Sequence, residues 1–527
     1  MIMKKFSWIA ILLMPCFLQA QQVADILLRH GKIVDGTGNP WFYGDMAIVN
    51  DTIAAIGNLQ HWQAKRIIDA NGLIIAPGFI DVHTHIENDE VRNPLATNFL
   101  MDGVTTVITG NCGLSRTNLQ QYFSLLDSLH LAVNAGSLIG HNDVRKAVMG
   151  NVNRLPTDSE LHEMEALVDK AMKNGAVGLS TGLIYTPGTY SKTPEIVALA
   201  KVAAAYNGVY ATHMRDEGDS VTEAIEEALT IAREANIPLE ISHFKLSGQQ
   251  NWGRSNETLQ MVVKARAQGL DVTIDQYPYT ASSTSLSTLL PDWTLTGNND
   301  SIKLKLQNKT IRKQCSDYML AKLKKRKLAH FNYAVVAYYK ADTTMNGKSI
   351  EQVNLAWKRK HTALSETETI MDMMMNGGSG MIFHGMSEQD VENIMKYPFN
   401  MIASDASIRI LNEGAPHPRG YGSNARVLGK YVREQQLIPL EEAVRRMTSL
   451  PAQKFHIENR GLLRKGYAAD IVVFDAATVK DMSTFEKPHQ YSQGFRFVIV
   501  NGRLSIENGV QNNVRNGAVI YGPGFTR

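Results

Sequence analysis

The sequence predicts an α/β protein: a (β/α)8 barrel of the TIM type, a small β-sandwich built from both chain ends, and a subdomain inserted after barrel strand seven. Three observations predict this fold. Apolar runs alternate with amphipathic stretches in the middle of the chain, both ends are rich in strand-like runs, and one interval is much longer than a single helix requires. The expected parts are residues 1–20 (export signal), 21–76 and 458–527 (sandwich), 77–457 (barrel) and about 291–380 (insertion).

The composition is that of an ordinary globular protein, and it excludes several classes. Of the 527 residues, 44% are hydrophobic and 20% are charged, which is typical of a folded chain. The net charge of +3 is small and argues against nucleic-acid binding as the main function. Three cysteines cannot form a disulfide framework. Beyond the N-terminal region, no run is long and apolar enough to predict a membrane span.

The first twenty residues have the pattern of an export signal. Two lysines precede an apolar run over residues 6–18, and Ala20 offers a small residue for cleavage. The run is too short to span a bilayer, and a buried N-terminal helix is the alternative. Pro15 beside Cys16 argues against lipoprotein cleavage. We therefore expect a periplasmic or secreted protein.

Both ends of the chain carry short apolar runs separated by turn residues. These runs are residues 26–28, 31–34 and 46–49 near one end, and 470–474 and 497–500 near the other. The Asn501-Gly502 pair that follows the last run is a hairpin signal. Two β-rich ends around a different middle predict one sandwich made from both.

Eight apolar runs in the middle of the chain have the character of buried parallel strands. They are residues 73–80, 104–109, 132–139, 177–179, 209–211, 239–241, 270–274 and 401–403. Amphipathic helical stretches lie between most of them. Residues 158–173, for example, begin after a capping Thr157 and end before Gly175. Eight such units predict a closed barrel whose active site lies at the carboxyl ends of the strands.

The interval between Tyr279 and Met401 is too long for one helix, so we expect an inserted subdomain over the barrel mouth. Residues 301–330 within it are rich in Lys and Arg, and Asp317 is their only acidic residue. Such a run is typical of a solvated helix face. The alternative is a positive field that draws carboxylate substrates toward the opening.

Side chains that bind metals or move protons follow five of the expected strands. They are His83 and His85 after strand one, Cys112 after strand two, His213 after strand five, His243 after strand six and Asp405 after strand eight. Residues two apart on a strand face the same side, so the first two imidazoles point together into the mouth. Each residue alone has a structural explanation, such as a core histidine or a helix cap. Their common placement at one rim predicts a metal centre.

Zinc is the expected metal, because several imidazoles and a thiolate favour a borderline-soft divalent ion. The ion would hold Cys112 as a thiolate, which explains an unpaired cysteine in an exported protein. Zinc lowers the pKa of a bound water toward neutrality. Asp405 is suited to accept a proton from that water and return it to a leaving amine. The expected reaction is hydrolysis of an amide or a related bond.

Several longer motifs resemble those of the N-acyl-D-amino-acid deacylases (D-aminoacylases), a branch of the amidohydrolase superfamily. They are residues 110–113 (GNCG), 178–188 (GLSTGLIYTPG), 212–217 (THMRDE), 275–279 (DQYPY), and the HPR of 417–419 ahead of the RVLG of 426–429. The resemblance extends over nearly the whole chain after the export signal. The β-rich termini also fit the small composite domain of that superfamily.

The resemblance implies a small-molecule substrate and two metal sites. The tight zinc site would consist of Cys112, His213 and His243. The second, weaker site would consist of His83 and His85, bridged by Cys112. Asp405 would be the general acid and base. The positions that match substrate contacts in the family are Lys245, Tyr185, Tyr277 and Ser283, and a lysine among tyrosine hydroxyls is a sensible clamp for an α-carboxylate.

Strand four, residues 177–180, contains no lysine. Many superfamily members bridge two metals with a carboxylated lysine there, whereas here Cys112 would supply the bridge. This departure favours deacylases of linear amides over cyclic-amide hydrolases. The leading interpretation is zinc-dependent hydrolysis of N-acyl-D-amino acids to a carboxylate and a free D-amino acid. A dipeptidase that acts on L-Xaa-D-Xaa dipeptides and a catalytically inactive binding protein are the alternatives, and the oligomeric state is left open.

Overall fold

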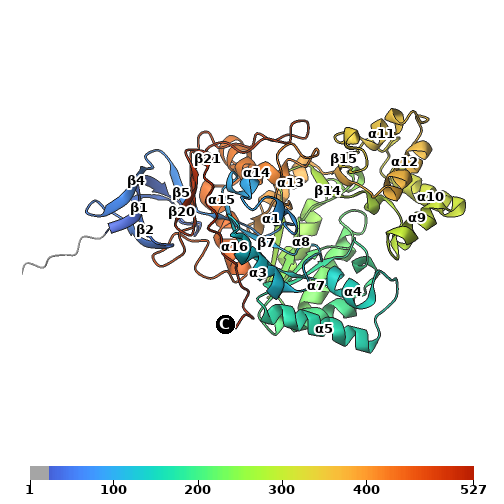
Figure 1. Cartoon of the computed structure of the whole chain (residues 1–527), viewed down its shortest axis with the longest axis horizontal. Helices are drawn as coiled ribbons and strands as arrows, with labels where there is room; N and C mark the ends of the chain where they lie inside the picture. Colours follow the sequence, from blue (N-terminus) through green and yellow to red (C-terminus); the bar gives the residue numbers. More distant parts are fainter. Residues whose placement is uncertain (1–22, 527) are drawn as a thin grey trace, which may run out of the picture.

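The computed structural model describes residues 23–526, and the expected export signal lies outside this range. Three parts follow one another along the long axis of the molecule: a sheet of strands from both chain ends, a barrel, and a mainly helical subdomain (Figure 1). Among the described residues, no helix is long and apolar enough to cross a membrane.

Strands from both ends of the chain form one nine-stranded sheet. The N-terminal strands are β1 (Val23–Ile33), β2 (Phe42–Val49), β3 (Thr52–Gly57), β4 (Gln63–Asp69) and β5 (Ile74–Pro77). The C-terminal strands are β18 (Ile471–Phe474), β19 (Phe495–Val500), β20 (Arg503–Glu507) and β21 (Val510–Gln511). The two sets join where β18 pairs antiparallel with β5, with Val473 opposite Ile75. Both residues belong to one buried apolar cluster, so each set of strands contributes to the core of the other.

Eight parallel strands form the barrel. They are β6 (Phe79–Asp81), β7 (Val104–Thr109), β8 (Asn134–Ser137) continued by β9 (Ile139–Gly140), β10 (Gly178–Gly182), β11 (Val209–His213), β12 (Leu239–Ile241), β13 (Val272–Gln276) and β17 (Asn400–Ile402). The β8–β9 continuation closes the barrel on one side, and a parallel bridge between Thr84 and Ala406 closes it on the other. Beside that bridge the Asp405 N–H donates to the His83 carbonyl at 2.9 Å, which holds the first and last strand ends together.

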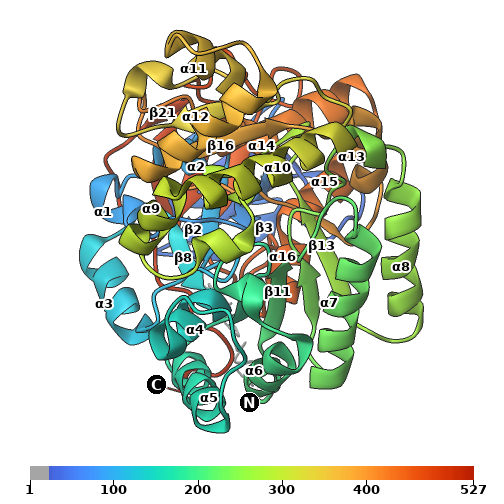
Figure 2. The same cartoon turned by 90° about the vertical axis from the view of Figure 1, so that its right-hand side faces the viewer.

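Helices surround the barrel (Figure 2). They are α1 (Asp89–Arg92), α2 (Thr97–Leu100), α3 (Leu119–Leu129), α4 (His141–Met149), α5 (Asp158–Lys173), α6 (Thr193–Ala204), α7 (Val221–Ala235), α8 (Ser255–Ala267), α13 (Glu388–Met395), α14 (Arg419–Arg426), α15 (Leu440–Met447) and α16 (Ser449–Lys454). The predicted helix over residues 158–173 is α5, and it opens with a capping box between Thr157 and Glu160. A π-helix, Val427–Glu434, continues α14.

Residues 73–80, predicted as one strand, are two strands in two different sheets. β5 pairs with β1 and β18, whereas β6 pairs with β7 in the barrel. The chain changes partners at Gly78, where a Cβ would lie 2.2 Å from Thr105 Oγ1. The prediction was wrong here because an apolar run does not reveal with which sheet each half pairs.

The inserted subdomain follows β13, the seventh barrel strand. Its elements are β14 (Ala281–Ser285), α9 (Asn299–Gln307), α10 (Lys309–Lys325), β15 (Ala334–Tyr338), α11 (Ile350–Ala356), α12 (Ala363–Met375) and β16 (Gly380–His384). β16 pairs antiparallel with both β14 and β15, and side chains such as Leu306, Met319 and Ile370 form a separate buried cluster. Because β14 is part of this sheet, the subdomain begins before the expected bound near residue 291.

Candidate metal centre and active site

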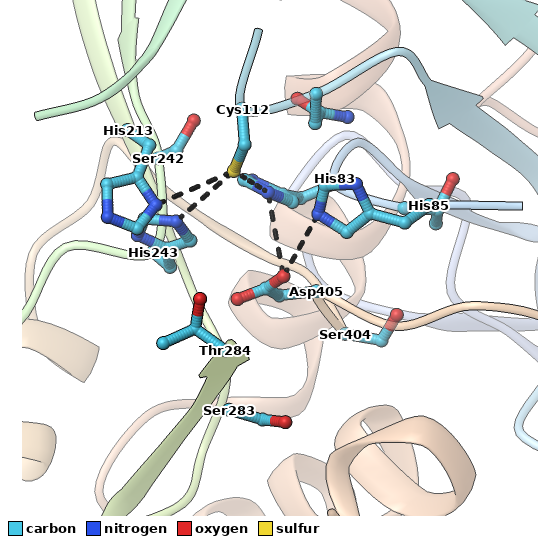
Figure 3. Close-up of polar contacts among 12 residues, drawn as sticks. His83, His85, Cys112, His213, Ser242, His243, Ser283, Thr284, Ser404 and Asp405 are labelled. Carbon is cyan, nitrogen blue, oxygen red and sulfur yellow. Dashed lines mark hydrogen bonds and ion pairs between the residues drawn. The ribbon is translucent and has the colours of Figure 1, made fainter. Parts of the chain in front are cut away.

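The sulfur of Cys112 lies at the centre of the predicted cluster (Figure 3). Its Sγ is 3.3 Å from His83 Nε2 and 3.6 Å from both His213 Nδ1 and His243 Nε2. In a tetrahedral zinc site, with bonds of about 2.3 Å to sulfur and about 2.0 Å to nitrogen, neighbouring ligand atoms lie roughly 3.5 Å apart. The donor atoms and their separations therefore fit a zinc ion.

A second group of ligand atoms shares the same sulfur. One atom each of His83, His85 and Cys112 lies within 4.8 Å of the others, and so do atoms of His83, His243 and Asp405. Asp405 Oδ1 is 3.3 Å from His85 Nε2 and 3.7 Å from His83 Nε2. Cys112 belongs both to the group with His83 and His85 and to the group with His213 and His243, so its sulfur lies between two sets of candidate ligands.

The electrostatic setting of Cys112 favours its thiolate. Burial would raise the pKa of this thiol, but His83 and hydrogen bonds from His213 and His243 hold the pKa well below its usual range. Cys315, in the core of the subdomain, shows the opposite behaviour, because burial raises the pKa of its thiol to about 11. Of the two cysteines in the described part of the chain, only Cys112 thus has the character of a metal ligand.

Three residues of the cluster have left-handed backbone conformations, with φ of 54° at Cys112, 37° at His243 and 49° at Asp405. Such a conformation costs a non-glycine residue on the order of 1 kcal/mol, and such strain is concentrated at functional sites. Two glycines make the turn around Cys112 possible. Gly110 and Gly113 have φ of 77° and 75°, and a Cβ on Gly113 would lie 2.1 Å from Asn142 Oδ1. The GNCG motif is therefore a tight turn that aims the sulfur at the histidines.

Asp275, on β13, contacts two of the histidines. Its Oδ2 lies 3.1 Å from Nδ1 of the His83 ring, and its Oδ1 accepts the backbone N–H of His243 at 2.8 Å. A carboxylate at Nδ1 fixes the ring and leaves Nε2 to face a metal. Sequence reasoning did not assign Asp275 a role, although it begins the DQYPY motif that follows a predicted strand.

Lys245 lies beside the cluster with its ammonium already paired. Nζ is 2.5 Å from Glu217 Oε1 and 2.8 Å from His243 Nδ1, and the lysine side chain is buried. Burial opposes ionisation of Glu217, but Lys245 and the neighbouring histidines hold the pKa of its carboxyl well below the usual range. A substrate carboxylate would have to compete with Glu217 for Lys245. Glu217 itself, the last residue of the THMRDE motif, had no role assigned from the sequence.

Arg419 lies against the predicted proton-transfer residue. Its Nη1 is 2.7 Å from Asp405 Oδ2, its Nη2 donates to the Ser283 carbonyl at 3.2 Å, and its guanidinium lies 4.5 Å from the centre of the Tyr277 ring. Burial would raise the pKa of Asp405, but Arg419 and His83 hold it well below the usual range. Asp405 is therefore ionised at neutral pH. Arg419 was visible in the sequence only as the last residue of the HPR motif.

Two cavities meet at the cluster. One, of about 1210 Å³, is lined by His85, Cys112 and Arg419 among others, and the other, of about 210 Å³, reaches the subdomain. Of the predicted substrate contacts, Tyr185 and Ser283 line both cavities, and Lys245 and Tyr277 line the smaller one. Tyr185 also packs its ring edge-on against His213, with centroids 4.9 Å apart. The structure thus brings every predicted site residue to one end of the barrel.

Comparison with known proteins gives a consistent result. The sequence profile described as "Amidohydrolase family" matches residues 66–506. The chain is 37% identical over 505 residues to the "D-aminoacylase" of Alcaligenes xylosoxydans xylosoxydans. The aligned region covers 91% of this chain and 94% of the relative.

Solved structures similar to this fold include two with a TM-score of 0.81. One is a crystal structure of D-aminoacylase, at 34% identity over 94% of this chain and 100% of that one. The other is N-acyl-D-glutamate deacylase from Bordetella bronchiseptica, at 33% identity over 95% of this chain and 100% of that one. That second protein was crystallised with zinc and a phosphonate inhibitor that mimics the tetrahedral intermediate.

Proposed function

This chain belongs to the amidohydrolase family, and on that premise we propose that it is an N-acyl-D-amino-acid deacylase. It would hydrolyse the amide bond of an N-acyl-D-amino acid to a carboxylate and a free D-amino acid. The proposal is supported by the D-aminoacylase and N-acyl-D-glutamate deacylase similarities. The observation that carries it is the Cys112 sulfur, 3.3 to 3.6 Å from three imidazole nitrogens at the mouth of two cavities.

Zinc is the metal that this donor set supports best. Cys112, His213 and His243 would hold one ion tightly, and His83 and His85 would hold a second, weaker one with Cys112 as bridge. When bound, zinc supplies Lewis acidity toward an amide carbonyl and lowers the pKa of water at the site.

Asp405 would carry the proton through the reaction. Because its carboxylate is ionised, it can accept a proton from the attacking water and then donate it to the nitrogen of the leaving D-amino acid. The His85 imidazole, 3.3 Å away, and Arg419 hold the carboxylate at the edge of the larger cavity.

We place the α-carboxylate of the substrate where the two cavities meet. Arg419 offers a buried Nε that has no hydrogen-bond partner within residues 23–526. Lys245 lies on the same aromatic ring, with Nζ 5.7 Å from the centre of Tyr277. Tyr185 and Ser283, which line both cavities, complete this environment. The larger cavity has room for the acyl group or, in the dipeptidase alternative, for a second amino acid.

The test is hydrolysis by the metal-loaded protein of N-acetyl-D-amino acids, their L-enantiomers and L-Xaa-D-Xaa dipeptides, with apolar, acidic and basic D-residues in each series. We expect kcat/KM for the preferred N-acetyl-D-amino acid to exceed that for its enantiomer by at least ~100-fold, equivalent to about 2.7 kcal/mol. Faster hydrolysis of the dipeptides would favour the dipeptidase. No hydrolysis of either series would contradict the proposal.

We further propose that the protein is exported to the periplasm or secreted. The proposal is supported by the two lysines and the apolar run that precede Ala20. Mass spectrometry of protein from the native host should find an N-terminus at Gln21, and an intact N-terminus in a cytoplasmic fraction would contradict it.

A further inference from the structure

A second cluster of metal-binding side chains lies in the inserted subdomain, apart from the barrel centre. It consists of His330, Glu351, His361 and Glu366, each of which offers one ligand atom within 4.8 Å of the others. His330 precedes β15, Glu351 is on α11, His361 is between α11 and α12, and Glu366 is on α12. The proposed hydrolysis uses none of them.

The two imidazoles of this cluster are stacked, with ring centroids 4.4 Å apart and planes inclined by 21°. Each directs a nitrogen at a carboxylate. His330 Nδ1 is 2.5 Å from Glu366 Oε1, and His361 Nε2 is 2.6 Å from Glu351 Oε1. The two His–Glu pairs are also close to each other, since His330 Nδ1 lies 3.8 Å from Glu351 Oε1. Two nitrogens and two oxygens therefore surround one small volume.

The carboxylate of Glu366 is held in place by the backbone. Its side chain is fully buried, and its Oε2 accepts the Phe331 N–H at 2.7 Å, which leaves Oε1 toward His330. Ligating carboxylates are commonly oriented by such an outer hydrogen bond. The opposite side of the cluster is open, because the His361 side chain is 53% exposed. An ion can therefore enter from solvent to a partly preformed site.

Separate His–Glu hydrogen bonds account for each pair taken alone, but they leave two imidazoles stacked face to face, each beside a carboxylate. A divalent cation binds imidazole nitrogens and carboxylate oxygens together, so one ion would make a single ligand set of the two pairs.

We propose that His330, Glu351, His361 and Glu366 form a second metal site that takes a divalent transition-metal ion, zinc in preference, through two nitrogens and two oxygens. In tetrahedral coordination with bonds of about 2.0 Å, these ligand atoms would lie roughly 3.3 Å apart. On metal binding, the His330–Glu366 and His361–Glu351 distances of 2.5 and 2.6 Å would lengthen. The 3.8 Å distance from His330 Nδ1 to Glu351 Oε1 would shorten.

Such an ion would brace one wall of the smaller cavity. Phe331, which follows His330, is buried and lines that cavity, and its N–H already donates to Glu366. An ion at this cluster would link the segment before β15 to α11 and α12. Its role would be structural, so its loss should lower the stability of the subdomain without removing the chemistry at Cys112.

Cobalt(II) distinguishes the two sites in the full-length protein. Cobalt bound to Cys112 gives a near-ultraviolet thiolate charge-transfer band, whereas a site of imidazoles and carboxylates gives only visible d–d bands. On titration of metal-free protein with cobalt chloride, the variant His361→Ala should lose about one equivalent of bound metal and part of the d–d intensity. Its charge-transfer band should be unchanged. His162→Ala, at an exposed histidine on α5, is the matched control and should titrate like the native protein.

Thermal unfolding gives an independent readout. Micromolar zinc should raise Tm of the native protein and of His162→Ala by about 3–5 °C more than it raises Tm of His361→Ala. Glu351→Gln keeps the side-chain size and removes the charge, so it should behave like His361→Ala. It provides a second test of the site if His361→Ala folds poorly. Equal cobalt stoichiometry and equal zinc-dependent shifts in all of these proteins would overturn the proposal.

Discussion

Oδ2 of Asp405 lies 2.7 Å from Nη1 of Arg419, and both side chains are almost completely buried. Removal from water alone would favour the protonated carboxyl, but a guanidinium at this distance reverses that preference. The proton affinity of the proposed acid and base therefore depends on an arginine fourteen positions later in the chain.

Replacement of Asp405 by asparagine should remove proton transfer while keeping the shape of the site. We expect kcat to fall by ~10³-fold, since general acid–base catalysis typically contributes 10²–10⁴-fold. The proposed metal site of Cys112, His213 and His243 should be unaffected, so metal content and kcat should be measured on the same preparation. Unchanged turnover with full metal content would exclude Asp405 as the proton carrier.

Replacement of Arg419 by glutamine should raise the pKa of Asp405, because it removes the nearby positive charge. The base is active when it is ionised, so the acid limb of the pH profile of kcat/KM should move to higher pH, by about 1–3 units. Arg419→Lys keeps the charge and should move the limb less. An acid limb that stays in place in Arg419→Gln would show that Arg419 does not set the ionisation of Asp405.

Replacement of Cys112 by serine should weaken metal binding, because serine lacks the anionic sulfur ligand that the surrounding histidines favour at this position. After dialysis against a weak chelator, we expect loss of at least ~90% of bound zinc and a fall in kcat/KM of ~100-fold or more. Cys315→Ser, in the core of the subdomain, is the matched control and should keep its barrel metal and activity. Similar zinc retention in both variants would remove Cys112 from the ligand set.

Metal removal should abolish hydrolysis and make one thiol reactive. With the ion gone, the lowered pKa of Cys112, which lines the larger cavity, should allow its alkylation at pH 7, whereas Cys315, with a thiol pKa of about 11, should stay unmodified. Peptide mass spectrometry after iodoacetamide treatment, with and without added zinc, measures this protection. Full activity after exhaustive chelation would contradict the metal centre.

Gly113→Ala should destabilise the turn that carries Cys112. A Cβ there would lie 2.1 Å from Asn142 Oδ1 and 2.8 Å from the Gly182 nitrogen, at a φ of 75°. Gly253→Ala is a matched control, since Gly253 has φ of 85° and a Cβ there would have nothing within 4 Å. Both variants incur about 1 kcal/mol for the left-handed conformation, and overpacking should bring the Gly113 variant to roughly 3 kcal/mol. Thermal unfolding and metal content should both separate the two variants, and equal Tm values would contradict the steric argument.

Much of the fold followed from local patterns. Buried parallel strands are nearly continuous apolar runs, and helices such as α5 begin at a capping residue, so the α/β fold class could be predicted, and the match to D-aminoacylase confirms it. The chemical groups of the candidate site were also predictable. Parallel strands present their carboxyl ends at one rim, so a residue's position after a strand, as at His213 and His243, indicated where its side chain would lie.

Contacts between distant segments were not predictable in this way. The separation of β5 from β6 at Gly78 and the pairing of β14 with β16 depend on strand partners that an apolar run does not specify. The positions of Asp275 on His83 and of Arg419 on Asp405 depend on side-chain directions at the ends of packed strands.

The sequence by itself thus determined the kinds of element, their order and the ligands available at the barrel rim, because local periodicity and chemistry encode them. Only the tertiary structure decided which carboxylate supports which histidine, and only it assembled His330 with His361. These relationships arise when packing brings together residues that are far apart along the chain.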